Sequence, residues 1–381
     1  MVITYIPADP ANYQGTNSIN AIDRRRLAAL IPYWEDLGIE VKRWQKNNES
    51  DLVYFVSLTQ SVKLARQLIL KKRKYAVVGG IIEDPFYADY AQCQSDDLFA
   101  LKNHFIEKNC GLTGFLRKTK RFLAKSNLIR QSKVDLFKLV KTCDGVITTS
   151  EAQATMIRQL NINSSGIADC MPETDFNGCS INYNQNAPLN VVWEGTGDGL
   201  QLIELVRPAL ESAYQKSKIP FEFMLVSPNL RGTPLFGLYD NKTILSKHYK
   251  LPTKFVSWNL ENLGNILSLA SIGIAPMPLN NPFFLNKAYS KPLTYMACSI
   301  PVIASPIPSY KELIRDGIDG FLPSKINEWT NYLILLLESP ELRKKIGEAG
   351  KKRLEQYHSV EIVAQKFADF FNKAIRFKRE K

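Results

Sequence analysis

The segment Lys291–Leu322, KPLTYMACSIPVIASPIPSYKELIRDGIDGFL, decides the fold class of this chain. A helical run of small residues, TYMACS, stands directly before a short apolar strand, IPVIAS, and a polar loop with glycines follows. A strand that is apolar on both faces is normally covered on both sides, as in a parallel sheet. Open α/β sheets bind ligands in the loops that follow such strands. The segment therefore predicts a parallel α/β domain with a ligand crevice at the ends of its strands.

Strand and helix patterns alternate on both sides of this segment. The expected strands are 1–8, 39–44, 51–58, 75–82 and 143–150 in the first half, and 190–195, 221–228, 253–258, 271–279 and 300–305 in the second. One long helix is expected over 15–38, because apolar residues recur there at helical spacing until Gly38. The pattern predicts an α/β fold of two tandem Rossmann-like domains with an inter-domain cleft and C-terminal helices.

The domain limits follow from a polar, Asn-rich stretch in the middle of the chain. We expect an N-terminal Rossmann-like acceptor domain over 1–175, a linker over 176–188 and a C-terminal Rossmann-like nucleotide-sugar domain over 189–355. The remaining residues, 356–381, are expected to form a helix that packs back on the N-terminal domain. A chain of 381 residues is too long for one ordinary core, which agrees with this division.

Composition limits the partners and the compartment. The formal net charge of +12 favours an anionic partner such as a phosphorylated ligand or a membrane surface. No apolar run reaches the roughly 18 residues that span a bilayer, and the N-terminus reads as a strand. The six cysteines form no C-x-x-C pair and there are only three histidines, so neither a zinc site nor a disulfide framework is expected. These features indicate a cytoplasmic protein with free thiols.

Four motifs carry a family resemblance: CDGVITTSEAQATMIRQL at 143–160, VVWEGTGDGLQLIELVRPAL at 191–210, SIGIAPMP at 271–278 and the segment Lys291–Leu322. They resemble glycosyltransferases of the GT-B fold, family 4. The resemblance implies a retaining enzyme that needs no metal and no cofactor besides its nucleotide-sugar substrate, of UDP or GDP type. It also implies that the C-terminal domain holds the donor and the N-terminal domain holds a lipid-linked or glycan acceptor.

The chain departs from the family where the donor would be bound. Two glutamates of the family fall on Asn286 and Thr294, which can hydrogen-bond hydroxyls but lack the strength of a carboxylate. We expect Asn286 to stand at the catalytic position and Thr294 at a donor-binding one. Gly195 and Thr196 are expected to bind the donor in the turn after the first strand of the second domain.

The family's diphosphate-binding cations are also missing from that turn, where Glu194 and Asp198 stand instead. Lys287 and Lys291 are the candidate replacements, because their spacing would place both on one face of the expected helix. The alternative is that the two lysines only keep an exposed helix soluble.

Three further residues complete the expected site. Asp84 could orient an acceptor hydroxyl or act as a catalytic base, although an Asp-Pro turn explains it equally well. Gly15 occupies the place of the family's glycine loop, where a backbone approaches the ligand, and a simple turn is the alternative. Glu312 lies where the family motif places a donor-binding glutamate, and a solvated carboxylate paired with Lys311 or Arg315 is the alternative.

The stretch Gly111–Val134 contains seven Lys or Arg residues and no acidic residue. Its expected membrane- or acceptor-contacting residues are Phe115, Arg117, Lys118, Lys120 and Arg121. An apolar helical face with flanking cations is typical of helices that lie on an anionic membrane, here the inner face of the cytoplasmic membrane. An amphipathic helix packed on the N-terminal domain is the alternative; no nucleic-acid-binding module is present, so nucleic acid is not expected.

The sequence leaves three functional hypotheses. The first is a hexosyltransferase-like enzyme of polysaccharide biosynthesis that moves a sugar from a nucleotide donor to a lipid-linked or glycan acceptor. The second is a catalytically inactive relative that binds ligand or acts as a scaffold with a protein partner, favoured by the two missing glutamates. The third is another GT-B-like enzyme, an epimerase or a phosphorylase, for which no specific signal is present.

Overall fold

The computed structural model describes residues 1–8, 13–14, 21–45, 49–58, 62–69, 73–81, 136–176, 178–184, 188–195, 202–228, 230–233, 237–240 and 250–380. Four parts of the expected site lie outside these residues: Gly15, Asp84, Thr196 and the basic stretch Gly111–Val134, which includes Phe115, Arg117, Lys118, Lys120 and Arg121. The expectations for those residues stay predictions.

The N-terminal part of the chain forms a six-stranded parallel sheet in the order β2-β1-β3-β4-β5-β6. Its strands are β1 (Val2–Ile6), β2 (Glu40–Arg43), β3 (Leu52–Phe55), β4 (Ala76–Ile81), β5 (Gly145–Thr148) and β6 (Ser164–Gly166). The helices among them are α1 (Ala21–Asp23), the π-helix η2 (Arg24–Ala28), α2 (Ile31–Asp36), α3 (Val62–Ile69) and α6 (Glu151–Ile157), followed by the 3₁₀ helix η3 (Glu173–Phe176). We call this sheet with its helices the N-terminal domain.

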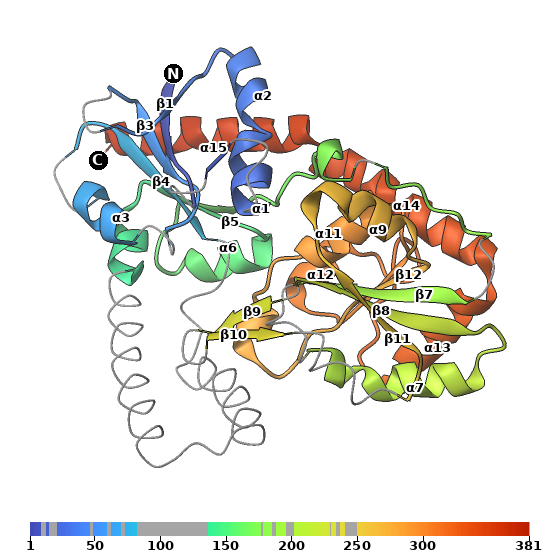
Figure 1. The fold of residues 1–381 in the computed structure, drawn as a ribbon. Coiled ribbons are helices and arrows are strands. Elements are labelled where there is room, and N and C mark those ends of the chain that lie inside the picture. Colours follow the sequence, from blue (N-terminus) through green and yellow to red (C-terminus); the bar gives the residue numbers. More distant parts are fainter. Residues whose placement is uncertain are drawn as a thin grey trace.

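The C-terminal part forms a second parallel sheet in the order β11-β8-β7-β12-β13. Its strands are β7 (Leu189–Glu194), β8 (Phe221–Ser227), β11 (Thr253–Ser257), β12 (Ile272–Ala275) and β13 (Val302–Ala304). Helices follow the strands: α7 (Arg207–Lys216), the 3₁₀ helix η5 (Leu260–Asn262), α9 (Leu263–Ser268), α10 (Pro282–Leu285), α11 (Ser290–Ala297), α12 (Pro308–Leu313), α13 (Ile326–Glu338), α14 (Pro340–His358) and α15 (Val360–Glu380). The two sheets occupy separate parts of the molecule (Figure 1). The expected fold class, two tandem Rossmann-like units followed by C-terminal helices, is confirmed.

Apart from the edge strands β2 and β11, which are largely exposed, both sheets are buried on both faces, as the apolar strands predict. In β3, Leu52 and Tyr54 face the core under α2 and α15, whereas Val53 and Phe55 face the core under α3. In β7 and β8 the same alternation separates a core under α7 and α13 from a core under α9, α11 and α12. Because side chains alternate along a strand, a sheet with two covered faces needs apolar residues at nearly every position.

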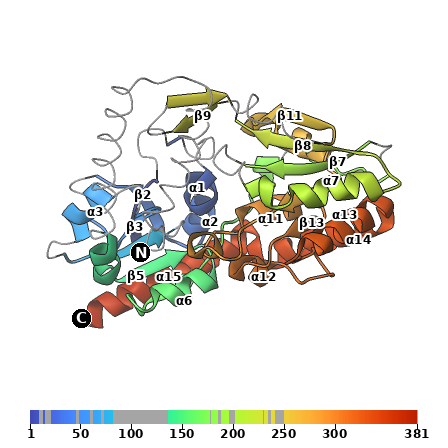
Figure 2. The same cartoon turned by 90° about the horizontal axis from the view of Figure 1, so that it is seen from below.

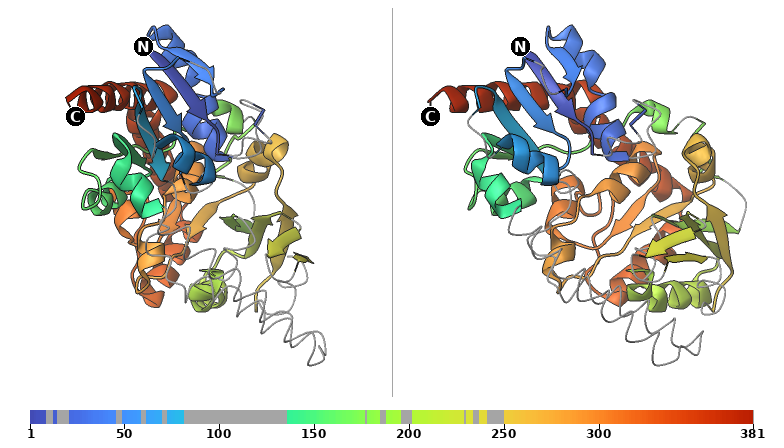
Figure 3. Two further views of the ribbon diagram at one scale, coloured as in Figure 1. Left: turned by 90° about the vertical axis from the view of Figure 1, so that its left-hand side faces the viewer. Right: turned by 60° about the vertical axis from the view of Figure 1, so that its left-hand side comes forward.

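The last helix returns to the N-terminal domain, as Figure 1 and the two side views in Figure 3 show. Phe367 and Phe371 of α15 are fully buried against Trp34 and Tyr54, with ring centroids 5.3–5.9 Å apart. The indole of Trp34 donates a hydrogen bond of 3.0 Å to the carbonyl of Ala364. The C-terminal helix therefore supplies a third of the buried residues of one core layer of the N-terminal domain.

The single helix expected over 15–38 is wrong. The chain forms instead the short helix α1, the π-helix η2 and the separate helix α2, which begins next to Pro32. Proline lacks the N–H that a continuing helix would need, so a new helix starts with Pro32 in its first turn. Arg24, Arg25 and Arg26 of the π-helix are buried.

Three strands were not expected from the sequence: β6, at the edge of the N-terminal sheet, and the antiparallel pair β9 (Leu230–Thr233) and β10 (Gly237–Asp240). Each is short and carries no long apolar run, so none gives the pattern of a buried strand. Among the described residues, no helix combines the length and the apolar character that a membrane span requires.

The junction between α14 and α15 predicts a pH-dependent stability. His358 is buried and lies edge-on to the ring of Tyr289, with centroids 5.8 Å apart. Burial, together with the charges of Lys366 and Arg353, lowers its pKa from 6.5 to about 4, while Asp169 acts in the opposite direction. The unfolded chain therefore binds this proton at a higher pH than the folded chain, and stability falls as the pH drops through this window.

We expect the free energy of unfolding to fall by about 2 kcal/mol from this group between about pH 7 and about pH 5. His358→Gln should remove most of that loss, measured as urea unfolding of both proteins at the two pH values. Equal losses in the wild type and the variant would show that His358 is not responsible.

Candidate functional site

The candidate site lies at the carboxyl end of the C-terminal sheet, where β7, β8, β11, β12 and β13 all end. β7 ends at Glu194 and β8 at Ser227, and Glu194 pairs in register with Val226. The backbone N–H of Gly195 donates to the carbonyl of Val226 at 3.0 Å, so the turn after β7 starts tightly against β8. Loops at this end of a parallel sheet are where ligands bind in open α/β folds.

Lys291 brings a cation to the turn after β7. Its Nζ lies 5.3 Å from the ring centroid of Trp193, the residue before Glu194. A Cβ atom on Gly195 would lie 2.9 Å from this Nζ and 2.8 Å from the Lys291 Cε. A side chain at position 195 would therefore push the lysine away from the backbone at the end of β7.

Glu194 places a carboxylate in the same region, and its surroundings are mainly cationic. Burial raises the pKa of the Glu194 carboxyl, while Lys291, Arg25 and a hydrogen bond from Trp258 act to lower it. Its backbone N–H donates at 2.8 Å to the hydroxyl of Tyr295, on the helix that carries Lys291. The end of β7 and helix α11 are thus fixed to each other by one buried tyrosine.

The two lysines do not share a helix face, so this expectation was wrong. α11 begins at Ser290 and includes Lys291, but Lys287 lies in the irregular residues between α10 and α11. Its carbonyl accepts a hydrogen bond of 2.6 Å from the hydroxyl of Ser309 on α12. Pro292 suits the first turn of a helix, which agrees with a start of α11 at Ser290 and not at Lys287.

The residues at the family's glutamate positions are buried. Asn286 is 6% exposed and lies just after α10, and Thr294 is 4% exposed in the middle of α11. Both therefore belong to the packed wall behind Lys291. The structure brings Gly195 and Lys291 together where β7 ends and α11 begins. Thr294 lies in the middle of α11, and Asn286 and Lys287 lie on the segment that leads into this helix.

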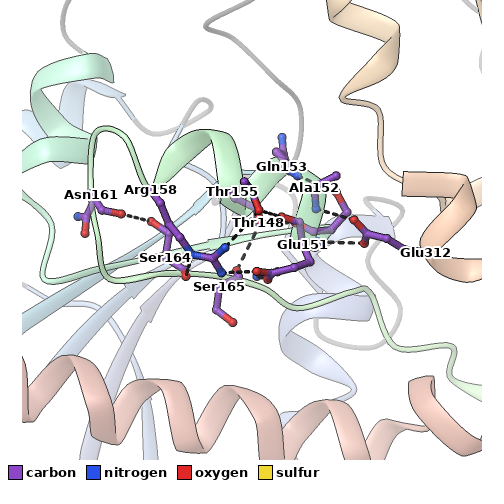
Figure 4. Close-up of polar contacts among 12 residues, drawn as sticks. Thr148, Glu151, Ala152, Gln153, Thr155, Arg158, Asn161, Ser164, Ser165 and Glu312 are labelled. Atoms are coloured by element: carbon purple, nitrogen blue, oxygen red, sulfur yellow. Dashed lines mark hydrogen bonds and ion pairs between the residues drawn. The ribbon is translucent and has the colours of Figure 1, made fainter. Parts of the chain in front are cut away.

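Glu312 does not pair with Lys311 or Arg315. Its carboxylate accepts hydrogen bonds from the backbone N–H groups of Glu151 at 3.0 Å and Ala152 at 2.5 Å, at the start of α6 in the other domain (Figure 4). Burial raises its pKa, and these two N–H groups partly offset that effect. Figure 2 shows α12 beside α6, where the two domains meet.

In this structure Glu312 contacts the other domain, whereas the sequence predicted that it contacts the donor. A carboxylate is stabilised at the start of a helix, because the first N–H groups have no partner within the helix. The hydroxyl of Ser150 accepts from the N–H of Gln153 at 3.2 Å, so Glu312 and the N-cap residue together satisfy three of these groups. Glu312 therefore joins the two domains.

Three consecutive arginines bind two aspartates on the segment that leads to the C-terminal domain, and sequence reasoning missed them. Arg24 and Arg25 both bind the carboxylate of Asp175 in η3, at 3.1 Å and 2.9 Å. Arg26 binds Asp169 at 2.9 Å and the carbonyl of Ile167 at 3.0 Å. Burial alone would raise the pKa of Asp175, but Arg25 and Arg24 outweigh it and lower the pKa.

The arginine cluster, Arg24–Arg26 with Asp169 and Asp175, extends to helix α11. The hydroxyl of Ser290, the first residue of α11, lies 3.4 Å from the other carboxylate oxygen of Asp169. The positive charge of Arg25 also acts to lower the pKa of the Glu194 carboxyl. In the sequence, only the run of three arginines at 24–26 could have indicated this cluster. Their aspartate partners lie more than 140 residues later in the chain. Among the described residues, no group of three His, Cys, Asp or Glu side chains could hold a metal ion.

One family model matches part of the C-terminal half of the chain. Residues 290–353 match the family model "Glycosyl transferases group 1", which covers the chain from α11 into α14. A trehalose synthase of Pyrococcus horikoshii is 26% identical over 185 residues, which is 47% of this chain and 41% of that protein. This chain therefore covers less than half the length of that relative.

Solved structures show a likeness over nearly the whole chain. Sucrose-phosphate synthase from Thermosynechococcus elongatus has a TM-score of 0.65 at 13% identity, covering 98% of this chain and 99% of that one. HepE of Anabaena, solved in complex with UDP-glucose, has a TM-score of 0.59 at 15% identity, covering 97% of this chain and 99% of that one. The chain thus has the GT-B fold and carries a segment of the group 1 glycosyltransferase type.

The arginine cluster generates a stability prediction. Asp175→Asn leaves Arg24 and Arg25 buried without their carboxylate, which should cost about 3 kcal/mol because an unpaired buried charge is poorly solvated. Urea or thermal unfolding measures this loss. Glu204→Gln is the matched control, since its pair with Arg207 is about 40% exposed and should contribute less than about 1 kcal/mol. A loss for Asp175→Asn no larger than for the control would contradict the assignment.

Proposed function

We propose that the chain is a glycosyltransferase that moves a sugar from a nucleotide-diphosphate donor to a lipid-linked or glycan acceptor, with retention of the anomeric configuration. Support comes from the match of residues 290–353 to a glycosyl transferase family model and from the likeness in fold to solved structures that include a UDP-glucose complex. The donor would bind at the carboxyl end of the C-terminal sheet and the acceptor at the N-terminal domain.

The position of Lys291 carries the proposal. It holds an ammonium group beside the backbone of the turn after β7, where Gly195 leaves room for it. A departing diphosphate needs positive charge at the place where its negative charge develops. Lys291 would bind the diphosphate and stabilise it as it leaves, and Asn286 and Thr294 would line the donor side through hydrogen bonds. The nucleotide sugar is the substrate in this proposal, and no further cofactor is required.

The proposal for the acceptor side rests on the sequence alone. Asp84 would contact the acceptor and Gly15 would contact the donor, both from the N-terminal domain. Thr196 would bind the donor in the turn after β7. Residues of the basic stretch would bring the N-terminal domain to an anionic membrane surface at the cytoplasmic face, which suits a lipid-linked acceptor.

A second candidate function is a non-catalytic subunit that binds a nucleotide or sugar and acts with a protein partner. Two observations favour it. Asn286 and Thr294 supply no carboxylate, and Glu312 is engaged with the start of α6. Release of nucleoside diphosphate from nucleotide sugars separates the two, because only a transferase turns its donor over.

Calorimetric titration with UDP, GDP and ADP, and then with the matching nucleotide sugars, tests donor binding. We expect one diphosphate to bind and Lys291→Ala to weaken it by about 10- to 100-fold, because a charge-assisted contact contributes about 1.5–3 kcal/mol. Lys287→Ala tests separately whether the second lysine contributes.

Lys344→Ala is the matched control, since Lys344 is 61% exposed on α14 and faces Glu348. It should bind as the wild type does. If the folded wild type binds none of the three diphosphates, or if Lys291→Ala binds as well as the control variant, the proposed donor site is wrong.

A further inference from the structure

We propose that a cavity at the amino end of the N-terminal sheet binds a phosphorylated polyol, either as a free small molecule or as the headgroup of a lipid. The cavity has a volume of about 560 Å³ and lies between the C-terminal half of α15 and the residues that precede β1 and β3. Cavities of this size hold small organic ligands in other proteins. We call it the α15 cavity.

The α15 cavity is separate from the proposed donor and acceptor sites. Met1 and Asp51 line it, and they stand directly before β1 and β3, at the amino ends of parallel strands. The expected acceptor residue Asp84 follows β4, so it belongs to the opposite, carboxyl end of the same sheet. Helix α15, which forms the other wall, runs along the N-terminal domain to the end of the chain (Figure 1). A ligand in this cavity would therefore leave the acceptor site open.

One face of α15 supplies most of the polar groups. Asp369, Asn372, Arg376 and Arg379 all line the cavity and follow each other three or four residues apart. Residues at this spacing lie on the same side of a helix. Their side chains are exposed, whereas the face of α15 with Phe367 and Phe371 is buried in the core. The helix thus packs with one face and presents a charged face to the cavity.

The two arginines are available to a ligand. Within the part of the chain that the structure describes, neither the Arg376 nor the Arg379 guanidinium has a hydrogen bond, an ion pair or a ring contact. A guanidinium group presents planar N–H donors that match the oxygens of a phosphate, and it keeps its charge at every physiological pH. Two such groups on one side of a helix suit a phosphate group that lies between them.

The two carboxylates and the amide favour a phosphate that carries hydroxyl groups. Asp51 accepts from the N–H of Val2 and Asp369 from the side-chain amide of Gln365, both at 2.8 Å. Each carboxylate can accept about four hydrogen bonds, so both have capacity left for hydroxyl donors. Their negative charges also balance those of the two arginines, which disfavours a ligand that consists of phosphate groups alone. The whole set of groups therefore matches a phosphorylated polyol.

The test measures binding of free polyol phosphates and of lipid vesicles by the full chain. Calorimetric titration uses glycerol 3-phosphate, inositol 1-phosphate and inorganic phosphate. Sedimentation uses vesicles of phosphatidylcholine that contain phosphatidylglycerol, whose headgroup is a phosphorylated polyol, or the same amount of phosphatidylserine, whose headgroup is not. The variants are Arg376→Gln and Arg379→Gln. Lys373→Gln is the matched control, because it removes one charge from an exposed position of α15 that does not line the cavity.

We expect each arginine variant to weaken the polyol phosphates by at least about tenfold, and the control to weaken them by less than about twofold. Saturable binding of the soluble compounds assigns the cavity to a free ligand. Binding only to phosphatidylglycerol vesicles, lost in the arginine variants and kept in the control, assigns it to a lipid headgroup. Asp369→Asn should weaken the polyol phosphates and leave inorganic phosphate unchanged, because it removes a charged acceptor for hydroxyl groups.

Three results would overturn the inference. The first is a folded wild type that binds none of the soluble compounds and does not prefer phosphatidylglycerol to phosphatidylserine vesicles. The second is equal binding by the arginine variants and Lys373→Gln, which would place any observed binding elsewhere on the basic surface. The third is an unchanged affinity of Asp369→Asn for the polyol phosphates, which would contradict hydroxyl recognition. None of them affects the proposed transfer, since donor binding should be the same in all these variants.

Discussion

The rest of the structure depends on the pairing of three buried arginines with Asp169 and Asp175. A guanidinium group does not lose its proton in a protein, so each buried arginine must keep a carboxylate or a carbonyl partner. The arginines belong to a π-helix of the N-terminal domain, and the two aspartates lie on the segment that leads to the C-terminal domain. This requirement fixes the path of the chain between the two sheets.

A short series of contacts connects the arginine cluster to the candidate site. Arg26 holds Asp169, Asp169 faces Ser290, and Ser290 begins the helix that carries Lys291. In a separate contact between the domains, Glu312 joins α12 to the start of α6. The group 1 segment, residues 290–353, therefore contains both the proposed donor cation and a residue that binds the other domain. The proposed donor binding and the contact between the domains would therefore involve the same short part of the chain.

The sequence predicted the features that depend on local pattern. Apolar strands and their alternation with helices predicted both parallel sheets. The segment Lys291–Leu322 predicted a ligand crevice at the strand ends, and that stays a prediction. The sequence did not predict the break at Pro32 or the π-helix, because the apolar spacing of 15–38 continues across both. Glu312 binds N–H groups about 160 residues away in the chain, and such a partner leaves no mark on the local sequence. Lys287 was misplaced because the start of α11 was set three residues too early.

The return of α15 to the first sheet has a consequence for the order in which the chain can fold during synthesis. Trp34 and Tyr54 leave the ribosome more than 300 residues before Phe367 and Phe371, which cover them. The C-terminal domain, whose cores are formed by residues 168–354, can close first. Until α15 arrives, one apolar face of the N-terminal sheet is uncovered and open to chaperones. The domain that is translated first is therefore the one completed last.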